Sequence, residues 1–390
     1  MTDDISRRGL LGLGLGAGMA LPAAGRAQRP SRAKSVDGVG FAVVGLGKLS
    51  LEQIVPGFRN CRSARLAALV SGDPEKANRL AAEQKLPPAS VYSYEEFDRI
   101  AGDPRIEVVY IVLPNFLHAE YTIRALKAGK HVLCEKPMAT SVADSERMIA
   151  AARKADRKLM IAYRCHYEPL NLYAMRKLRS GVLGKPRLVN TDMGRQSDLS
   201  DPSDAWRLDM AKSGGGALTD MGIYGINGVR YLLNEEPVEV RAWAQTDRRD
   251  PRFRTVEDLI SWQFRFPSGA LSNGSTSFSY AATMAWDVYC ERGRMTADPG
   301  AFYGGNRLVL SGVPGEREPK IAEIDQFARE MDWMADVVRG RAPLVSPGEE
   351  GLQDMRLMEA ILKSVARGGA TIRTDWGYRR AVDPAAVVKA

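Results

Sequence analysis

Short apolar runs alternate with amphipathic stretches through the first half of the chain, beginning at Val39. The apolar runs predict strands at 39–44, 65–70, 108–113, 131–134 and 159–163. The amphipathic stretches predict helices at 51–60, 74–84, 118–128 and 141–155. The run at 108–113 is continuously apolar, which is typical of a parallel strand buried on both faces. This alternation predicts a Rossmann-type, doubly wound parallel sheet.

The pattern changes after Tyr167 to one typical of an antiparallel sheet. It predicts strands at 188–193, 238–246, 259–266 and 270–280, and a hairpin formed by 286–290 and 294–297. It predicts helices at 170–180 and 223–233, and two Met-rich helical stripes at 324–338 and 352–365, interpreted as packing faces. We therefore predict an α/β protein, with a Rossmann-type domain at 39–165 and an α+β domain at 166–390 that contains a large open antiparallel sheet.

The first 38 residues precede this pattern. Residues 1–27 contain the pair Arg7-Arg8, then a weakly apolar Gly/Leu/Ala run, then small residues before Gln28, as in a cleavable export signal. The paired arginines are similar to a twin-arginine signal, whose pathway exports folded proteins, so we expect a periplasmic enzyme. An anchoring or frayed N-terminus is the competing interpretation. Residues 28–38 lack apolar periodicity and predict an extended arm.

Composition excludes several classes of protein. The 390 residues are 45% hydrophobic and 26% charged, which is ordinary for a globular chain and excludes disordered, collagen-like and disulfide-rich miniproteins. The net charge of +8 is scattered along the chain, so we expect no nucleic-acid partner. The apolar run near the N-terminus is too short and too rich in glycine for a membrane anchor.

The four cysteines have no metal-binding or redox spacing, and no metal site is predicted. In an oxidising compartment they could pair. We interpret all four as small buried apolar residues. They are Cys61, Cys134, Cys165 and Cys290.

The first predicted strand ends in a glycine-rich turn that leads directly into a helix. Gly45 allows the tight turn, Gly47 lets the backbone approach a pyrophosphate, and the small Ser50 lets the helix pack on the strand. In this context we predict dinucleotide binding by the turn, including Leu46, Lys48 and Leu49. A plain glycine-rich turn is the alternative.

The end of the second strand indicates which nicotinamide cofactor is used. A carboxylate there would bind the ribose 2′-hydroxyl of NAD, but Ser71 and Gly72 occupy the position. Ser71 can donate to a 2′-phosphate, and Lys76 can neutralise its charge. Asp73, which precedes Pro74, is interpreted as the cap of the next helix. These residues favour NADP over NAD.

Two further strands carry polar residues at their carboxyl ends, the edge where open α/β sheets bind ligands. One is followed by a segment that we assign to cofactor binding, with Leu113, Pro114, Asn115, Leu117 and His118. The next is followed by Glu135 and Lys136, also assigned to the cofactor site. A lysine there can hold a substrate hydroxyl and lower the pKa of a neighbouring acid/base group. A solvated pair in a turn is the competing interpretation.

A third cluster follows a run of glycines in the second domain. Asp220 and Tyr224 are four residues apart, so on a helix they share one face and can address the same substrate atom. The alternative is that the glycines allow close packing and that Tyr224 is a buried aromatic residue.

These motifs together resemble the glucose-fructose oxidoreductase / inositol dehydrogenase family of sugar oxidoreductases, over nearly the whole chain. Within it, the chain is most similar to the branch that contains the periplasmic glucose-fructose and aldose-aldose oxidoreductases. The matching segments are 45–48, 70–72, 135–137, 163–167, 222–225, 346–351 and 374–378. Most members have His where this chain has Tyr224, and Tyr is the variant of that branch. The loop at 195–204 departs from the family pattern, and it is where we expect sugar choice to be set.

The resemblance implies roles for further residues. It implies that Lys136, Asp220 and Tyr224 line the sugar site, and that Ser71 and Lys76 hold the 2′-phosphate of NADP. It also implies that a wider set lies near the cofactor or the sugar: Tyr163, Arg164, Trp206, Arg207 and Tyr303. It implies that the N-terminal arm embraces the cofactor or a neighbouring subunit. The second-domain sheet would form the interface of a homo-oligomer, either a dimer or a tetramer.

Export and cofactor use constrain each other, because free NADP(H) is not expected outside the cytoplasm. We therefore expect tightly bound NADP(H) and a ping-pong cycle, in which one aldose becomes a lactone and a second sugar, aldose or fructose, becomes an alditol. Tyr224 is the predicted acid/base group, with its pKa lowered by Lys136, and Asp220 is expected to orient the sugar and keep Lys136 charged. The alternatives are an NADP-dependent aldose dehydrogenase that exchanges its cofactor, and a non-catalytic sensor on the same fold.

Overall fold

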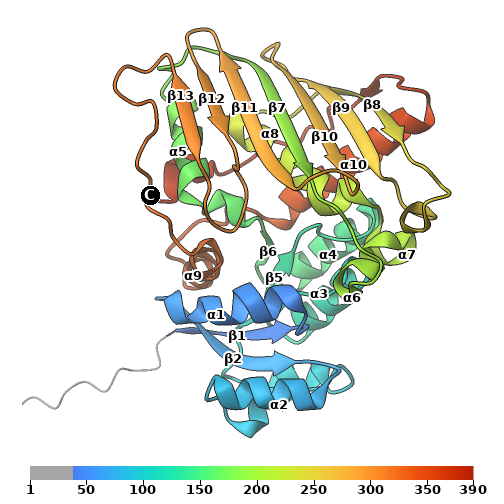
Figure 1. Ribbon diagram of the computed structural model, residues 1–390. Coiled ribbons are helices and arrows are strands. Elements are labelled where there is room, and N and C mark those ends of the chain that lie inside the picture. Colours follow the sequence, from blue (N-terminus) through green and yellow to red (C-terminus); the bar gives the residue numbers. More distant parts are fainter. Residues whose placement is uncertain (1–37, 390) are drawn as a thin grey trace, which may run out of the picture. The chain divides into compact units, whose positions relative to one another are not determined.

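The computed structural model describes residues 38–389, which are built around two β-sheets (Figure 1). The predicted signal at 1–27 and residues 28–37 of the predicted arm lie outside the described residues. No helix in the described part of the chain is long and apolar enough to cross a membrane.

The first sheet has six strands, all paired in parallel, in the order β3-β2-β1-β4-β5-β6. The strands are β1 (Val39–Val44), β2 (Ala64–Val70), β3 (Val91–Tyr92), β4 (Val108–Ile111), β5 (His131–Glu135) and β6 (Leu159–Ala162). Every residue of β1 and β4 is buried, as expected for strands covered on both faces. The predicted doubly wound sheet is confirmed, and the two-residue edge strand β3 was missed because it is too short to show a period.

The helices of this part follow the prediction except at 51–60. They are α1 (Val55–Gly57), α2 (Pro74–Glu83), α3 (His118–Lys127) and α4 (Val142–Ala155). The predicted α-helix at 51–60 is a π-helical turn (Ser50–Ile54), the short α1 and a 3₁₀ turn (Phe58–Asn60). The Asp73 carboxylate accepts from the backbone N–H of Lys76, so the predicted cap of α2 is confirmed.

The second sheet has eight strands in the order β13-β12-β11-β7-β10-β9-β8-β14. They are β7 (Pro186–Gly194), β8 (Glu239–Gln245), β9 (Leu259–Arg265), β10 (Leu271–Ser277), β11 (Thr283–Cys290), β12 (Arg294–Ala297), β13 (Leu308–Ser311) and β14 (Ile372–Arg373). The predicted large antiparallel sheet is confirmed, and the parallel pairing of β10 with β7 inside it was not predicted. The periodicity of single strands cannot show which strands become neighbours.

Helices pack on one face of this sheet, where α8 contacts β7 and α10 contacts β8 (Figure 1). The helices of this part are α5 (Pro169–Arg179), α6 (Pro202–Ala205), α7 (Met210–Ser213), α8 (Ile223–Leu233), α9 (Gln326–Val338), α10 (Gly348–Ala366) and α11 (Pro384–Val387). A π-helical turn (Leu218–Gly222) leads directly into α8.

Helix α9 packs against the first sheet, although it lies far along the chain. Its Met331 and Met334 are fully buried in one cluster with residues of β1 and β2. The interpretation of the Met-rich stripes as packing faces is confirmed, as Met355 and Met358 of α10 are buried too. Ile324, assigned to the first stripe, precedes α9 and is 44% exposed, because the helix is capped only at Asp325.

All four cysteines are free. Cys134 is fully buried, whereas Cys61, Cys165 and Cys290 are partly exposed, so the prediction of four buried cysteines is right only for Cys134.

Candidate active site

A cavity of about 1080 Å³ opens at the carboxyl ends of β1, β4 and β5. It brings together most of the residues that the sequence singled out. Those that line it are Gly45, Leu46, Gly47, Lys48, Leu49, Ser71, Gly72, Lys76, Leu113, Pro114, Asn115, Glu135, Lys136, Arg164, Trp206, Arg207, Asp220, Tyr224 and Tyr303. The edge of a doubly wound sheet is where such folds bind ligands.

The glycine-rich turn has the geometry that a dinucleotide requires. Gly45 has a φ of +94°, and a Cβ there would lie 2.3 Å from the carbonyl oxygen of Val112. At Gly47 a Cβ would meet nothing within 4 Å, so the backbone faces open space in the cavity. Ser50 is buried, and its hydroxyl donates to the carbonyl oxygen of Gly45. The turn therefore fits a pyrophosphate approaching the backbone at Gly47.

The end of β2 offers hydrogen-bond donors and positive charge to the same cavity. Ser71 and Lys76 line it, and the backbone N–H of Asp73 donates to the Ser71 hydroxyl. The Lys76 ammonium lies 3.6 Å from the Asp73 carboxylate, so its charge is partly balanced. Asp73 itself lines the cavity, but its carboxylate is engaged in capping α2.

A partly buried ion cluster centred on Asp220 forms another part of the cavity lining. The Asp220 carboxylate lies 3.2 Å from Arg195, 3.2 Å from Arg207 and 3.7 Å from the Lys136 ammonium. Lys136 also donates to the backbone carbonyl of Asp220 at 2.8 Å. Burial disfavours the charged carboxylate, but Arg207, Lys136 and Arg195 together hold the pKa of Asp220 well below its usual range. Burial lowers the pKa of Lys136, against the attraction of Asp220 and Glu135.

Two cations lie close to the ring of Tyr224. The Lys136 ammonium is 4.5 Å and the Arg164 guanidinium 4.9 Å from the centroid of its ring. Burial raises the pKa of Tyr224 to about 12, and Arg164 is the charge that opposes this most. The expectation that Lys136 lowers the pKa of Tyr224 below its ordinary value is therefore wrong, because burial outweighs the neighbouring charges.

Arg164 is fixed in an aromatic corner of the cavity. Its guanidinium donates to the Gln326 side chain at 2.6 Å and to the carbonyl of Ala301 at 2.7 Å, and lies 4.6 Å from the Tyr303 ring centroid. Tyr303 packs edge-to-face on Phe327. Residues more than a hundred positions away in the sequence therefore hold the Arg164 side chain in place.

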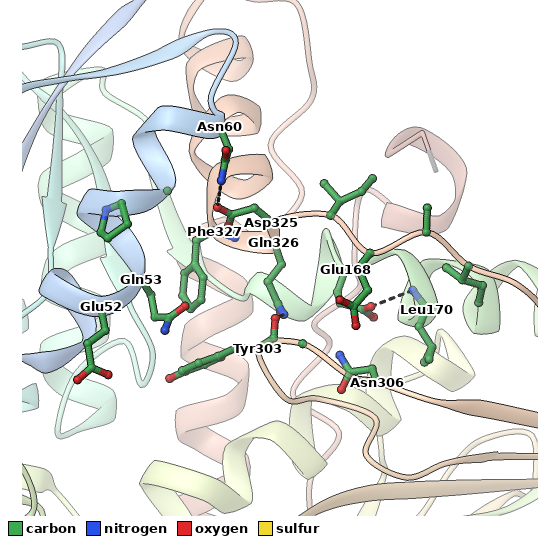
Figure 2. A pocket seen from close by; sticks show the side chains of 17 residues that line it. Glu52, Gln53, Asn60, Glu168, Leu170, Tyr303, Asn306, Asp325, Gln326 and Phe327 are labelled. Atoms are coloured by element: carbon green, nitrogen blue, oxygen red, sulfur yellow. Dashed lines mark hydrogen bonds between the residues drawn. The ribbon is translucent and has the colours of Figure 1, made fainter.

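A second cavity of about 350 Å³ is also lined by this aromatic pair (Figure 2). Tyr303 and Phe327 line both cavities. Glu52 and Gln53 lie on one side of it, and Asn306 lies on the other. Tyr303 and Phe327 therefore form the boundary between the two cavities.

Three predicted site residues do not line the large cavity. Leu117 is packed against the core. His118 is buried, and its two ring nitrogens contact the carbonyl oxygens of Pro137 and Leu113, each at 2.8 Å. The hydroxyl of Tyr163, predicted at the sugar, donates to the buried carboxylate of Asp354. These three residues contact other parts of the protein rather than the large cavity.

Sequence reasoning missed several residues that line the cavity. The loop at 195–204, where we expected sugar choice to be set, lines the cavity through Arg195, Asp201 and Asp204, none of which was assigned to the site individually. Asp201 precedes α6, Asp204 lies in α6, and Arg195 joins Asp204 to Asp220. Tyr94 comes from a segment with no recognisable motif, and Phe327 belongs to the stripe at 324–338 that was interpreted only as a packing face. Only Asp201 had a local signal, because an aspartate before Pro202 is typical of a helix cap, and it does cap α6.

Comparison with known families gives two matches that together cover most of the chain. The profile of the GFO/IDH/MocA oxidoreductase family, described as an NAD-binding Rossmann fold, matches residues 39–163. The profile described as the GFO/IDH/MocA C-terminal domain matches residues 172–296.

The matches to individual relatives extend over nearly the whole length of each relative. The chain is 32% identical over 341 residues to D-xylose 1-dehydrogenase [NADP(+)] of Haloarcula marismortui, covering 86% of this chain and 93% of that protein. It is 25% identical over 341 residues to 1,5-anhydro-D-fructose reductase of Ensifer adhaerens, covering 85% and 97%. The crystal structure of aldose-aldose oxidoreductase from Caulobacter crescentus, complexed with glycerol, has 43% identity and a TM-score of 0.82, covering 86% of this chain and 99% of that one.

Proposed function

Because this chain belongs to the GFO/IDH/MocA oxidoreductase family, we propose that it is an NADP-dependent sugar oxidoreductase that works by ping-pong transfer between two sugars. One observation carries the proposal: a single cavity contains both the glycine-rich turn and the group of Lys136, Asp220 and Tyr224. The similarity to an NADP-dependent xylose dehydrogenase and to an aldose-aldose oxidoreductase supports sugars as substrates.

The residues present fit NADP. The backbone at Gly47 would hold the pyrophosphate, and Ser71 with Lys76 would hold the 2′-phosphate, because all three residues line the cavity. Asp201 and Trp206 line the same cavity as Lys48. NADP bound in this cavity would supply hydride transfer between C1 of an aldose and the carbonyl carbon of a second sugar.

The chain's own residues handle the proton and the orientation. Tyr224 takes the C1 hydroxyl proton in the first half-reaction and returns one to the carbonyl oxygen in the second. Lys136 donates to the same oxygen and stabilises its developing negative charge. Asp220 is fully ionised and is surrounded by cations, so its role is to fix Lys136 and the sugar rather than to accept a proton.

The remaining parts of the proposal come from the sequence. The twin-arginine pattern at 1–27 supports export of the folded enzyme to the periplasm. An exported enzyme keeps its NADP(H) bound between half-reactions, since the compartment supplies none. Assembly is proposed to be a homo-oligomer through the second sheet. The proposed oligomer follows from the resemblance to the family, and the proposed export follows from the pattern at residues 1–27.

The test is an absorbance measurement on the mature protein, purified without added nucleotide. A band near 340 nm that appears with glucose or another aldose and disappears with a second sugar supports retained, recycled NADP(H). The Tyr224→Phe variant should keep its cofactor and lose turnover by about 100-fold or more. Near-full turnover in that variant contradicts the role of Tyr224.

A second candidate is an aldose dehydrogenase that exchanges its cofactor, which the similarity to xylose dehydrogenase favours. It predicts nucleotide-free protein that is active only with added NADP. Cell fractionation separates the two further, because the exchanging enzyme needs a cytoplasmic supply of cofactor.

A further inference from the structure

A small cavity lies beside Tyr224. It measures about 30 Å³, and Lys136 and Tyr224 line it together with Tyr163, His166 and Tyr231. A buried water needs about 10–15 Å³ of such space, so the cavity has room for about two water molecules.

Unpaired polar atoms indicate that water occupies this space. The Nδ1 atom of His166 and the hydroxyl of Tyr231 are buried and have no hydrogen-bond partner among the residues that the structure describes. Both residues line the cavity. Buried polar groups left unpaired cost about 1–3 kcal/mol each, which favours ordered water that pairs them.

The neighbouring network fixes which atom of His166 accepts. Asn227 donates through Nδ2 to the Asp354 carboxylate at 2.8 Å, so its Oδ1 faces the Nε2 of His166 at 2.7 Å. Nε2 therefore carries the imidazole proton, and Nδ1 presents a lone pair. Burial lowers the pKa of His166 to about 3, so the ring is neutral and orients water without holding a proton.

Tyr163 connects the cavity to a buried carboxylate. It lines the cavity, and its hydroxyl donates to Oδ2 of Asp354 at 2.6 Å. Asp354 lies on α10 and is fully buried. The charged and titratable groups that face it are Arg230 of α8, which pairs with it, Glu350 one turn earlier on α10, and Tyr163.

We propose that Tyr163, cavity water and Asp354 form an internal proton relay that exchanges a proton with Tyr224 in each half-reaction. This inference rests on the proposed function. As the C1 hydroxyl of the aldose loses its proton to Tyr224, the phenol passes its own proton to a cavity water. That water passes a proton to the Tyr163 oxygen, and Tyr163 passes its proton to Asp354, which becomes a carboxylic acid. Reduction of the second sugar runs the same transfers in reverse, so the protons balance over the cycle.

The relay answers a requirement of the site. A phenol with a pKa of about 12 is protonated at neutral pH, so Tyr224 can take the sugar's proton only if its own proton leaves. Burial, against the pull of Arg230, raises the pKa of Asp354 to about 6, which makes it a proton acceptor near neutral pH.

The relay predicts opposite pH dependences for the two half-reactions. Aldose oxidation requires ionised Asp354, so its single-turnover rate at 340 nm should fall about tenfold per pH unit below pH 6. Sugar reduction requires protonated Asp354, so its rate should fall as the pH rises above 6. Tyr163→Phe should lower both rates at least tenfold and remove the inflection near pH 6.

Matched variants separate a relay from a structural role. Tyr92 is also a buried tyrosine that donates to a carboxylate, that of Asp103 at 2.7 Å, so Tyr92→Phe should leave both profiles unchanged. Asp354→Asn is the second relay variant, since Arg230 keeps its contacts with Glu236 and Glu350. Thermal unfolding and bound NADP establish that each variant is folded and loaded.

Two measurements test the relay without turnover. Infrared titration of the resting holoenzyme should show a protonated carboxyl band with a midpoint near pH 6 that is missing in Asp354→Asn. A high-resolution crystal structure should show water at His166 Nδ1. A dry cavity, or a wild-type pH profile in Tyr163→Phe, overturns the relay alone. No 340 nm band with any aldose in the unmodified enzyme overturns the proposed function, and the relay with it.

Discussion

Asp220→Asn should be among the most damaging single changes to the stability of this protein. The carboxylate is 16% exposed and is the common partner of Lys136, Arg195 and Arg207. Asparagine keeps the shape and removes only the negative charge. Three cations are then left close together around a neutral amide.

The expected loss follows from the distances. At an effective dielectric of about 20, a pair of unit charges 3.2 Å apart attracts by about 5 kcal/mol. Desolvation and the mutual repulsion of the cations offset much of this, so we expect a net loss of about 3 kcal/mol in the free energy of unfolding. That is a large share of the usual stability of a folded domain.

The pH dependence gives the sign of the effect. The folded-state pKa of Asp220 is held below its unfolded value of about 3.9, so its contribution is complete above that value and is lost as the pH falls through the folded pKa. The difference in the free energy of unfolding between wild type and variant should therefore be constant from pH 5 to 8 and become smaller only below about pH 4.

Urea unfolding of the nucleotide-free protein, followed by circular dichroism, measures this difference. Asp336→Asn is the matched control, because Asp336 pairs at 2.7 Å with the exposed Arg341 and should cost less than about 1 kcal/mol. If Asp220→Asn loses no more stability than Asp336→Asn, the cluster does not depend on the carboxylate charge, and the reasoning is refuted.

Three further outcomes follow from the cofactor side of the site. Ser71→Asp should weaken NADP at least tenfold relative to NAD, because a carboxylate beside a 2′-phosphate is repelled; calorimetric titration of both nucleotides measures it, and an unchanged ratio contradicts the placement of the phosphate. Gly45→Ala should lower the free energy of unfolding by more than about 1 kcal/mol, since its Cβ would meet the carbonyl of Val112 at a φ of +94°. Gly47→Ala has open space for its Cβ, so it should keep wild-type stability in the same urea assay and lose NADP affinity, and normal affinity there would place the pyrophosphate elsewhere.

Much of the fold was predictable because its signals are local. Continuous apolar runs predict the burial of β1 and β4. The pair Asp73-Pro74 predicts the cap of α2. Which strands pair with each other was not predictable, as the parallel pair of β7 and β10 shows. Apolar and polar residues alternate along a strand in the same way whether its neighbour is parallel or antiparallel.

The candidate site was predicted in part for the same reason. Gly45, Lys136 and Asp220 were found from turns and strand ends, and they do line one cavity. Arg195 was missed, because its contact with Asp220 arises only when the loop after β7 folds back. Tyr163 was found but misplaced, since its motif gives a position in the chain and not the direction of its hydroxyl.

The sequence by itself determined the parallel sheet, the glycine-rich turn and the types of residue at the strand ends, since these depend on periodicity and on neighbours within a few positions. Only the tertiary structure decided the acidity of Tyr224, the small cavity beside it and the link from Tyr163 to Asp354. The physical reason is that burial and electrostatic interaction depend on all groups within several ångströms. In this site those groups come from segments up to 191 positions apart.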